Sequence, residues 1–365
     1  MNLFSYIDKY GCYTFDEVSF NEVDNLVFSS LSYVSLDGYV SSNRFNKRTI
    51  KDVGNKYITN YDKNVKNITA IKVGIRVLRD IMNTRRYGDL LLYNYSYVGD
   101  EKQQFSAITI EINKNLVYVS YEGTDHLISG WHEDFMMAYM FPIFSQRRAI
   151  DYLNRHFLFN NKDIILGGHS KGGNLAMVAG MYANFWVKDR IISIYNNDGP
   201  GLRKKEIESK YYMSIKDRLI HIIPNYSIIG LLLRHDDNYI VVRSSRKSIY
   251  AHDLSTWVVR DALLERTTLS SVSKFLDEGM IKWLDKYDDV SREKFVDALF
   301  MVFDRAGVVS LNDIISNKKL ILKIIMETKG IDKDTRKIMR DFIHVLFEYF
   351  KEVKVDPLFD RKRYN

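Results

Sequence analysis

The stretch IILGGHSKGGNLAMVA, residues 164–179, decides the fold of this chain. It begins with apolar, β-branched residues that are typical of a buried strand, and it ends with residues that favour a helix. Between them stands Gly168-His169-Ser170-Lys171-Gly172. A serine in such a strand–turn–helix occupies a sharp, strained turn that exposes its hydroxyl at the edge of the sheet. Gly168 and Gly172 are needed because a Cβ at either position would collide with the neighbouring strand or helix.

This turn makes Ser170 the candidate nucleophile. A serine hydroxyl is a weak nucleophile, so it needs a general base and a third group that orients the base. In an α/β-hydrolase these groups follow in the order serine, acid, histidine. The turn also directs the amide of Lys171, at the helix N-terminus, toward an oxyanion formed on the substrate.

Three histidines follow Ser170 at a suitable distance. His221 lies inside a predicted strand, residues 218–223, and is expected to be a packed or edge residue. His235 belongs to a predicted surface turn. His252 lies in a loop after the last predicted strand, where the base of such a fold is expected, and is favoured for this reason.

Asp198 is the best candidate for the acid. It follows the predicted strand 191–196, at the carboxyl end where the site of a parallel sheet forms. The alternative is a structural aspartate, because the sequence Asp-Gly-Pro-Gly at 198–201 strongly favours a turn by itself. The other acidic candidates are Asp236, Asp237 and Asp253.

The second oxyanion donor is expected in the loop after strand 116–121. Gly123 allows the backbone to approach a substrate, and Thr124 offers an amide and a hydroxyl. Thr124 or Asp125 would also be suitable as a helix cap, and both interpretations are compatible. A loop over the cleft is expected next, with structural roles in packing and capping, at Trp131, Glu133 and Asp134.

Alternation of strands and helices after residue 145 predicts a parallel sheet with helices on both faces. Antiparallel strands at 90–97, 105–112 and 116–121 precede it, so we expect a mixed, mostly parallel sheet of the α/β-hydrolase fold. We expect one such domain over 1–260, with a helical segment at about 15–85, and a helical subdomain over 261–365. The expected helices are 21–32, 69–83, 145–159, 172–183, 291–307 with Ser291 as N-cap, 311–328 and 333–353; the later strands are 164–166, 191–196, 218–223 and 239–243.

Composition excludes several classes of protein. Cys12 is the only cysteine, which excludes an internal disulfide and fits a reducing compartment. With no export signal at residues 1–15 and no apolar run long enough for a membrane span, a cytoplasmic location is expected. The net charge of +7 would favour peripheral contact with an anionic membrane surface, or it reflects a lysine-rich composition. The basic residues are scattered, so no nucleic acid is expected, and no ligand spacing predicts a metal or an organic cofactor.

Several segments resemble the Mbeg-like family of bacterial proteins, which is distantly similar to the class 3 (fungal-type) triacylglycerol lipases. The resemblance covers roughly residues 14–260. It rests on the following segments: FDEV (15–18), NEVD (21–24), QFSAIT (104–109), GTD (123–125), GWHEDF (130–135), GHSKGGNLA (168–176), NDGPG (197–201), PNYSIIG (224–230), His252-Asp253 and Trp257.

The resemblance implies an α/β-hydrolase fold and an acyl ester as substrate, small or derived from a lipid. Two residues depart from the pattern. Glu122 stands where the family has an arginine, which reverses a charge beside the oxyanion loop. Ser227 matches the position of the acid in fungal lipases and cannot serve as one, which moves the acid to Asp198 and leaves open a weakened triad.

The sequence therefore predicts a serine hydrolase of the lipase or esterase kind, with a triad of Ser170, Asp198 and His252 and oxyanion donors at Thr124 and Lys171. One alternative is a non-catalytic binding or regulatory protein on the same scaffold, favoured by Glu122 and Ser227. Another is a peptidase or acyltransferase that uses the same triad.

Overall fold

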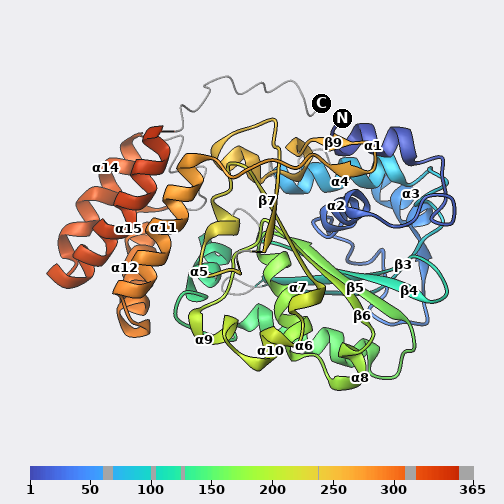
Figure 1. Ribbon diagram of the computed structural model, residues 1–365, viewed down its shortest axis with the longest axis horizontal. Coiled ribbons are helices and arrows are strands. Elements are labelled where there is room, and N and C mark those ends of the chain that lie inside the picture. Colours follow the sequence, from blue (N-terminus) through green and yellow to red (C-terminus); the bar gives the residue numbers. More distant parts are fainter. Residues whose placement is uncertain (61–68, 100–103, 125–127, 237, 309–317, 353–365) are drawn as a thin grey trace.

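An eight-stranded sheet forms the centre of the molecule, and its strands follow one another in sequence order. The computed structural model describes residues 1–60, 69–99, 104–124, 128–236, 238–308 and 318–352 (Figure 1). The strands are β1 (Arg48–Thr49), β2 (Leu91–Gly99), β3 (Gln104–Glu111), β4 (Leu116–Tyr121), β5 (Asp163–His169), β6 (Ile191–Asn197), β7 (Leu219–Pro224) and β8 (Tyr239–Val242).

Strands β1 to β4 pair antiparallel, and β4 to β8 pair parallel. This is the mixed, mostly parallel sheet of an α/β-hydrolase fold that the sequence predicts. A short antiparallel pair, β9 (Val259–Arg260) with β10 (Leu263–Leu264), follows the sheet. Because parallel neighbours in sequence order are joined by right-handed crossovers, their helices gather on one face of the sheet.

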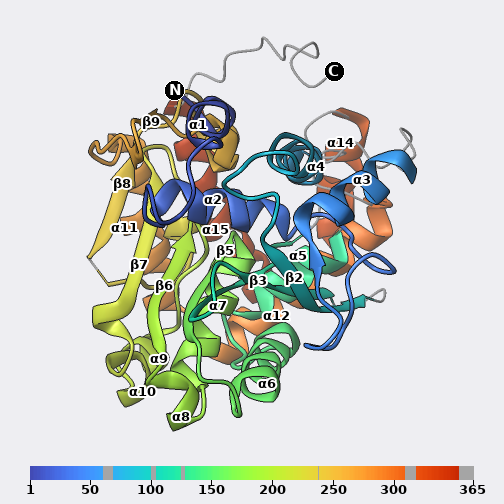
Figure 2. The same cartoon turned by 90° about the vertical axis from the view of Figure 1, so that its right-hand side faces the viewer.

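Helices cover both faces of the sheet, as Figures 1 and 2 show from two directions. The crossover helices lie below it in both views: α6 (Phe144–Phe157), α7 (Lys171–Tyr182), α8 (Phe185–Lys188), α9 (Lys204–Ile207) and α10 (Lys210–Met213). The N-terminal helices lie above it: α1 (Leu3–Tyr10), α2 (Glu22–Leu31), α3 (Ile50–Asn60) and α4 (Thr69–Ile81). Alternate side chains of β5 face opposite sides of the sheet. Ile164 and Leu166 pack with the crossover helices, and Ile165 packs with the N-terminal helices.

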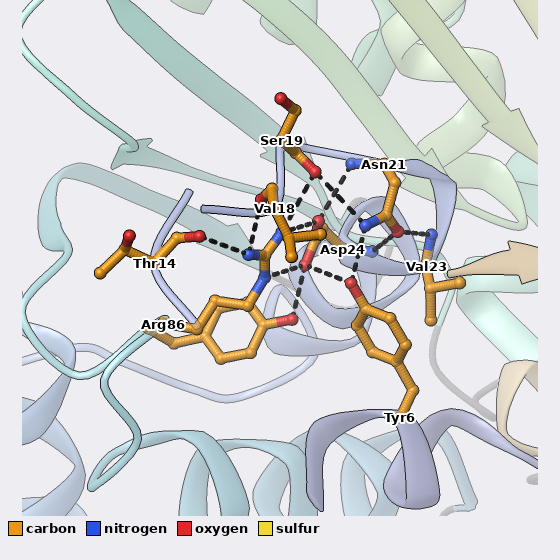
Figure 3. Close-up of polar contacts among 9 residues, drawn as sticks. Tyr6, Thr14, Val18, Ser19, Asn21, Val23, Asp24 and Arg86 are labelled. Carbon is orange, nitrogen blue, oxygen red and sulfur yellow. Dashed lines mark hydrogen bonds and ion pairs between the residues drawn. The ribbon is translucent and has the colours of Figure 1, made fainter. Parts of the chain in front are cut away.

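A buried ion pair ties the N-terminal segments together (Figure 3). The guanidinium of Arg86 donates to both carboxylate oxygens of Asp24 on α2, at 2.8 and 2.6 Å, and both side chains are fully buried. Arg86 also donates to the backbone oxygens of Thr14 and Val18. Tyr87 donates to Asp24 at 2.6 Å. The pair therefore fixes the loop before α2 to the chain after α4.

The C-terminal helices form a separate layer at one end of the sheet, at the left of Figure 1. Their apolar residues pack into one core with α5 (Ile128–Met136) and the 3₁₀ turn η2 (Ile229–Leu231). The remaining 3₁₀ turns are η1 (Lys216–Arg218), η3 (Ser248–His252), η4 (Leu254–Thr256) and η5 (Thr328–Gly330). The C-terminal helices are α11 (Ser271–Lys286), α12 (Asp289–Ala306), α14 (Lys318–Glu327) and α15 (Lys333–Glu352).

Several predicted elements need correction. The loop predicted at Trp131, Glu133 and Asp134 is the helix α5. Ser291 is not an N-cap, because α12 begins two residues earlier and its cap Asp288 accepts from the Ser291 amide at 2.9 Å. Helix α1 was not predicted, whereas α3 and α11 lie in segments predicted to be helical, although neither was predicted as a separate helix. Residues 311–317 of the predicted helix 311–328 lie outside the described residues. Among the described helices, none has the length and hydropathy to cross a membrane.

Candidate active site

Ser170 occupies the sharp turn between β5 and α7. Its backbone has φ 59° and ψ −134°, a conformation that costs an L-residue energy and is found mostly at functional sites. A Cβ on Gly168 would lie 2.4 Å from the carbonyl carbon of Gly172, and one on Gly172 would lie 2.2 Å from the oxygen of Tyr121. Only glycine fits at these two positions, so the glycines in the sequence allow the sharp turn that carries Ser170.

His252 and Asp198 are in direct contact although 54 residues separate them. Nδ1 of His252, at the end of η3, lies 2.6 Å from Oδ2 of Asp198, and the Asp198 side chain is fully buried. The end of β6 also lies against the turn of residues 168–172, which we call the elbow, since the Ser170 amide donates to the oxygen of Asn197 at 3.0 Å. The structure thus brings the predicted acid and base into contact, and the ring centroid of His252 lies 4.2 Å from that of His169, the residue before Ser170.

The other oxygen of Asp198 is held by two donors. Ser227 Oγ donates to Oδ1 at 2.5 Å, and the Gly230 amide donates to the same atom at 3.1 Å. Ser227, the position where the resemblance places an acid, therefore lies beside the carboxylate that takes its place. Together with His252, these donors fix the plane and position of the Asp198 carboxylate.

For the ester hydrolysis that the sequence predicts, replacing Ser227 with alanine is expected to lower kcat about tenfold, with KM unchanged. The variant loses a hydrogen bond to a buried charged group, which contributes about 1.5 kcal/mol or more. Steady-state kinetics on a chromogenic ester measure the effect. Ser245→Ala, at an exposed serine, is the control. An unchanged kcat would show that Gly230 alone suffices to hold Asp198.

His169 connects the elbow to the loop that carries His252. Its Nε2 lies 2.8 Å from the backbone oxygen of His252, and its Nδ1 lies 2.9 Å from the hydroxyl of Tyr33. Since a carbonyl only accepts, Nε2 carries the proton and Nδ1 accepts from Tyr33. Burial lowers the pKa of His169 well below its usual value, so the ring is neutral. The sequence reasoning missed Tyr33 because it lies 136 residues before its partner.

The loop with Gly123 and Thr124 passes beside Ser170. A Cβ on Gly123 would lie 2.1 Å from the Tyr33 hydroxyl, 2.5 Å from the His169 oxygen and 3.1 Å from the Ser170 Cβ. There is no room for a side chain at Gly123, so glycine at this position lets the loop backbone pass close to Ser170. The Thr124 hydroxyl makes a short hydrogen bond to Asp134. Asp125, the other cap candidate, lies outside the described residues.

Lys171 holds a buried cluster of charges next to Ser170. Its ammonium lies 3.2 Å from Glu133 and 3.4 Å from Asp134, both on α5, and the lysine side chain is fully buried. Burial lowers the pKa of Lys171, but the two carboxylates raise it by more, so the lysine is charged. The sequence predicted packing and capping roles for Glu133 and Asp134 but not their pairing with Lys171. Glu133 does accept a hydrogen bond from the amide of Ser145, at the start of α6.

Burial raises the pKa of Asp134 from 3.8 to about 6, against the lowering effect of Lys171 and Thr124. Because the folded state binds this proton more tightly, Asp134 stabilises the protein most below about pH 4 and loses this contribution as the pH rises through about 6. Asp134→Asn is expected to remove this dependence. The free energy of unfolding of wild type minus that of the variant should fall by about 2 to 3 kcal/mol from pH 4 to pH 7.

Urea denaturation at a series of pH values measures this difference. The exposed Asp151 provides the control, since Asp151→Asn should follow the wild-type pH dependence. A difference between wild type and Asp134→Asn that stays constant across the range would contradict the assignment.

The two histidines that the sequence offered as alternatives to His252 have largely buried side chains outside the predicted triad. His221 is buried in β7, and burial together with His235 lowers its pKa to about 3. His235 is not in a surface turn as predicted: its side chain is largely buried and its Nε2 lies 3.2 Å from Asp277 of α11. The C-terminal helices cover this histidine, and the sequence offered no local signal of that contact.

A pocket of about 640 Å³, counted with the space at its mouth, opens at Ser170. Apart from Ser170, Lys171 and Asp134 its walls are apolar, and they come from α5, from the segment around η2 and from the C-terminal helices. Among the described residues, no group of three or more His, Cys, Asp or Glu side chains is arranged to hold a metal ion.

Three comparisons place the chain among known proteins. The solved structures include a lipase, described as the crystal structure of M37 lipase, with 16% sequence identity and a TM-score of 0.35; the alignment covers 57% of this chain and 69% of the lipase chain. No curated protein matches. The model of the Mbeg1-like family matches residues 81–301, a range that starts and ends later than the resemblance visible in the sequence. By this match over more than half of its length, the chain belongs to the Mbeg1-like family.

Proposed function

We propose that the protein is a serine hydrolase that cleaves acyl esters through Ser170, His252 and Asp198. One observation carries the proposal: the residue next to a strained serine at a strand–helix turn, His169, has its ring 4.2 Å from the ring of His252, whose Nδ1 contacts a buried carboxylate at 2.6 Å. The backbone strain at Ser170 costs stability, and the three groups together match the needs of a nucleophile, a base and an orienting acid.

The reaction follows from the roles of these groups. Ser170 Oγ attacks the ester carbonyl carbon and gives its proton to Nε2 of His252, because Nδ1 is bonded to Asp198. The amides of Thr124 and Lys171 stabilise the negative oxygen. As the intermediate collapses, the bond to the alkoxy oxygen breaks and His252 protonates the departing alcohol.

Hydrolysis of the acyl-enzyme repeats these steps with water. Water attacks the acyl carbon and gives a proton to His252. The bond to Ser170 Oγ then breaks, the serine regains the proton, and a carboxylic acid leaves. No cofactor or metal takes part in this scheme.

The two departures from the resemblance bear on whether the site is active. Glu122 cannot anchor the oxyanion loop as an arginine would, but the Thr124 hydroxyl donates to Asp134, which Lys171 contacts, and this provides an anchor for the loop. The absence of an acid at Ser227 is made up by Asp198. Both arrangements favour a working enzyme over a non-catalytic scaffold. The apolar pocket at Ser170 favours an apolar acyl ester over a peptide.

Labelling with a fluorophosphonate tests the proposal. The wild type should gain the mass of one phosphonyl group, and Ser170→Ala should gain none. Ser245→Ala, at an exposed serine, should label like the wild type. A wild type that never labels, while its circular dichroism shows a folded protein, would favour a binding or regulatory role on this scaffold.

A further inference from the structure

We propose that the pocket at Ser170 receives a straight hydrocarbon acyl chain, and that the C-terminal helices set the chain length that the enzyme accepts. This inference rests on the proposed function, because it assigns the acyl half of the substrate to one side of the nucleophile. It concerns a part of the chain, α11, α12 and α15, to which the triad assigns no role.

The C-terminal helices supply a large part of the pocket wall. Met280, Trp283 and Leu284 of α11, Phe295 of α12 and Phe342 of α15 line it together with Ser170. These residues lie more than 100 positions after the nucleophile, yet they share a cavity with it. A substrate bound through Ser170 would therefore contact the C-terminal layer directly.

Aromatic rings form a rigid part of this wall. The ring centroids of Phe295 and Phe342 lie 4.9 Å apart. The ring centroid of Trp283 lies 5.2 Å from that of Phe295 and 5.3 Å from that of Phe342. The ring centroid of Phe135 of α5 lies 6.0 Å from that of Phe342, so α5 adds a fourth ring to the group. Trp283 is fixed further by its indole hydrogen bond to the oxygen of Ile338 at 3.3 Å. Packed rings of this kind limit how far a chain can extend.

The charges in the wall are already paired, so the pocket suits an uncharged chain. Lys171 lies 3.4 Å from Asp134 and 3.2 Å from Glu133, and these contacts satisfy the ammonium within the protein. A charged or strongly polar acyl group would lose its hydration among apolar side chains without gaining a partner. A hydrocarbon chain loses nothing and gains the burial of its methylenes.

Chain-length kinetics test the inference. The probes are straight-chain p-nitrophenyl esters from acetate through butyrate, octanoate and dodecanoate to hexadecanoate. For the wild type, kcat/KM should rise about fourfold with each methylene that enters the pocket. It should stop rising once the pocket is filled.

Two variants of the wall should change this profile in opposite directions. Met280→Ala removes atoms from the wall and should move the optimum to longer chains. Ala138→Leu adds atoms to it and should lower kcat/KM for the longest accepted chain about tenfold or more. Met213→Ala, at an exposed methionine of α10 outside the pocket, is the matched control. Opposite shifts cannot arise from a general loss of stability.

A binding measurement separates this inference from the proposed function. Trp131 and Trp283 line the pocket, so decanoate bound there should change the tryptophan fluorescence of Ser170→Ala, and acetate should not. A flat chain-length profile, or unchanged profiles in both wall variants, would overturn the inference while hydrolysis by Ser170 stands. A protein that neither labels nor hydrolyses yet binds decanoate would refute the proposed function and leave the pocket assignment in place. If decanoate fails to bind as well, both fall.

Discussion

Asp198→Asn will lower kcat for ester hydrolysis about ten-thousandfold while leaving the fold intact. The reason lies in the hydrogen bonds of the carboxylate. Oδ1 accepts from the amide of Gly230 and from Ser227, and a backbone amide only donates. An asparagine at this position must keep its oxygen there, so its NH₂ group would face Nδ1 of His252. The imidazole would then carry its proton on Nε2, where it is unable to accept the proton of Ser170.

Kinetics on a short-chain ester, with circular dichroism to verify folding, measure this effect. Asp253→Asn is the control, because Asp253 is adjacent to His252 in sequence and its side chain caps η4 by accepting from the amide of Ser255. Turnover of this control should remain within a few-fold of the wild type. Near-normal turnover in Asp198→Asn would remove Asp198 from the triad.

Arg86→Met is expected to lower the free energy of unfolding by about 3 to 5 kcal/mol, because it leaves the buried carboxylate of Asp24 without its cation (Figure 3). Burial lowers the pKa of Arg86, but the hydrogen bonds and the charge of Asp24 raise it by more, so the guanidinium is charged in the folded protein. Asp24 retains the hydroxyl of Tyr87 and the amide of Asn21 as donors, which do not neutralise it.

The neighbouring arginine offers a matched control. Arg85 pairs with Glu17, but both side chains are largely exposed, at 62% and 43%. Water screens such a pair, so Arg85→Met should change the free energy of unfolding by no more than about 1 kcal/mol. Urea denaturation of the three proteins gives the comparison. Equal losses in both variants would show that burial does not set the strength of the Arg86 contact.

The fold could be predicted where local sequence directs local structure. The turn at Ser170 is one such place, because its close packing has no room for a Cβ at Gly168 or Gly172 and the sequence has glycine at both positions. The position of Asp198 is another, since the carboxyl ends of neighbouring parallel strands meet at one edge of the sheet. The same geometry brings Ser227, which follows the adjacent strand β7, to the Asp198 carboxylate.

Other parts of the site depend on contacts that no local pattern contains. The pairing of Lys171 with Glu133 and Asp134 requires α5 to pack over the elbow, and the sequence there predicts a loop. The apolar pocket requires helices from the end of the chain to lie beside Ser170. Their amphipathic pattern predicts helices with one buried face, but it does not say which surface each face covers.

The structure of the protein after reaction with an alkyl phosphonate tests the central claim most directly. We expect phosphorus bonded to Ser170 Oγ and the phosphoryl oxygen at the amides of Thr124 and Lys171. Nε2 of His252 should lie within hydrogen-bond distance of a phosphonate oxygen, while its Nδ1 keeps the contact with Asp198. Phosphorus on another residue, or an imidazole other than that of His252 beside the adduct, would contradict the mechanism.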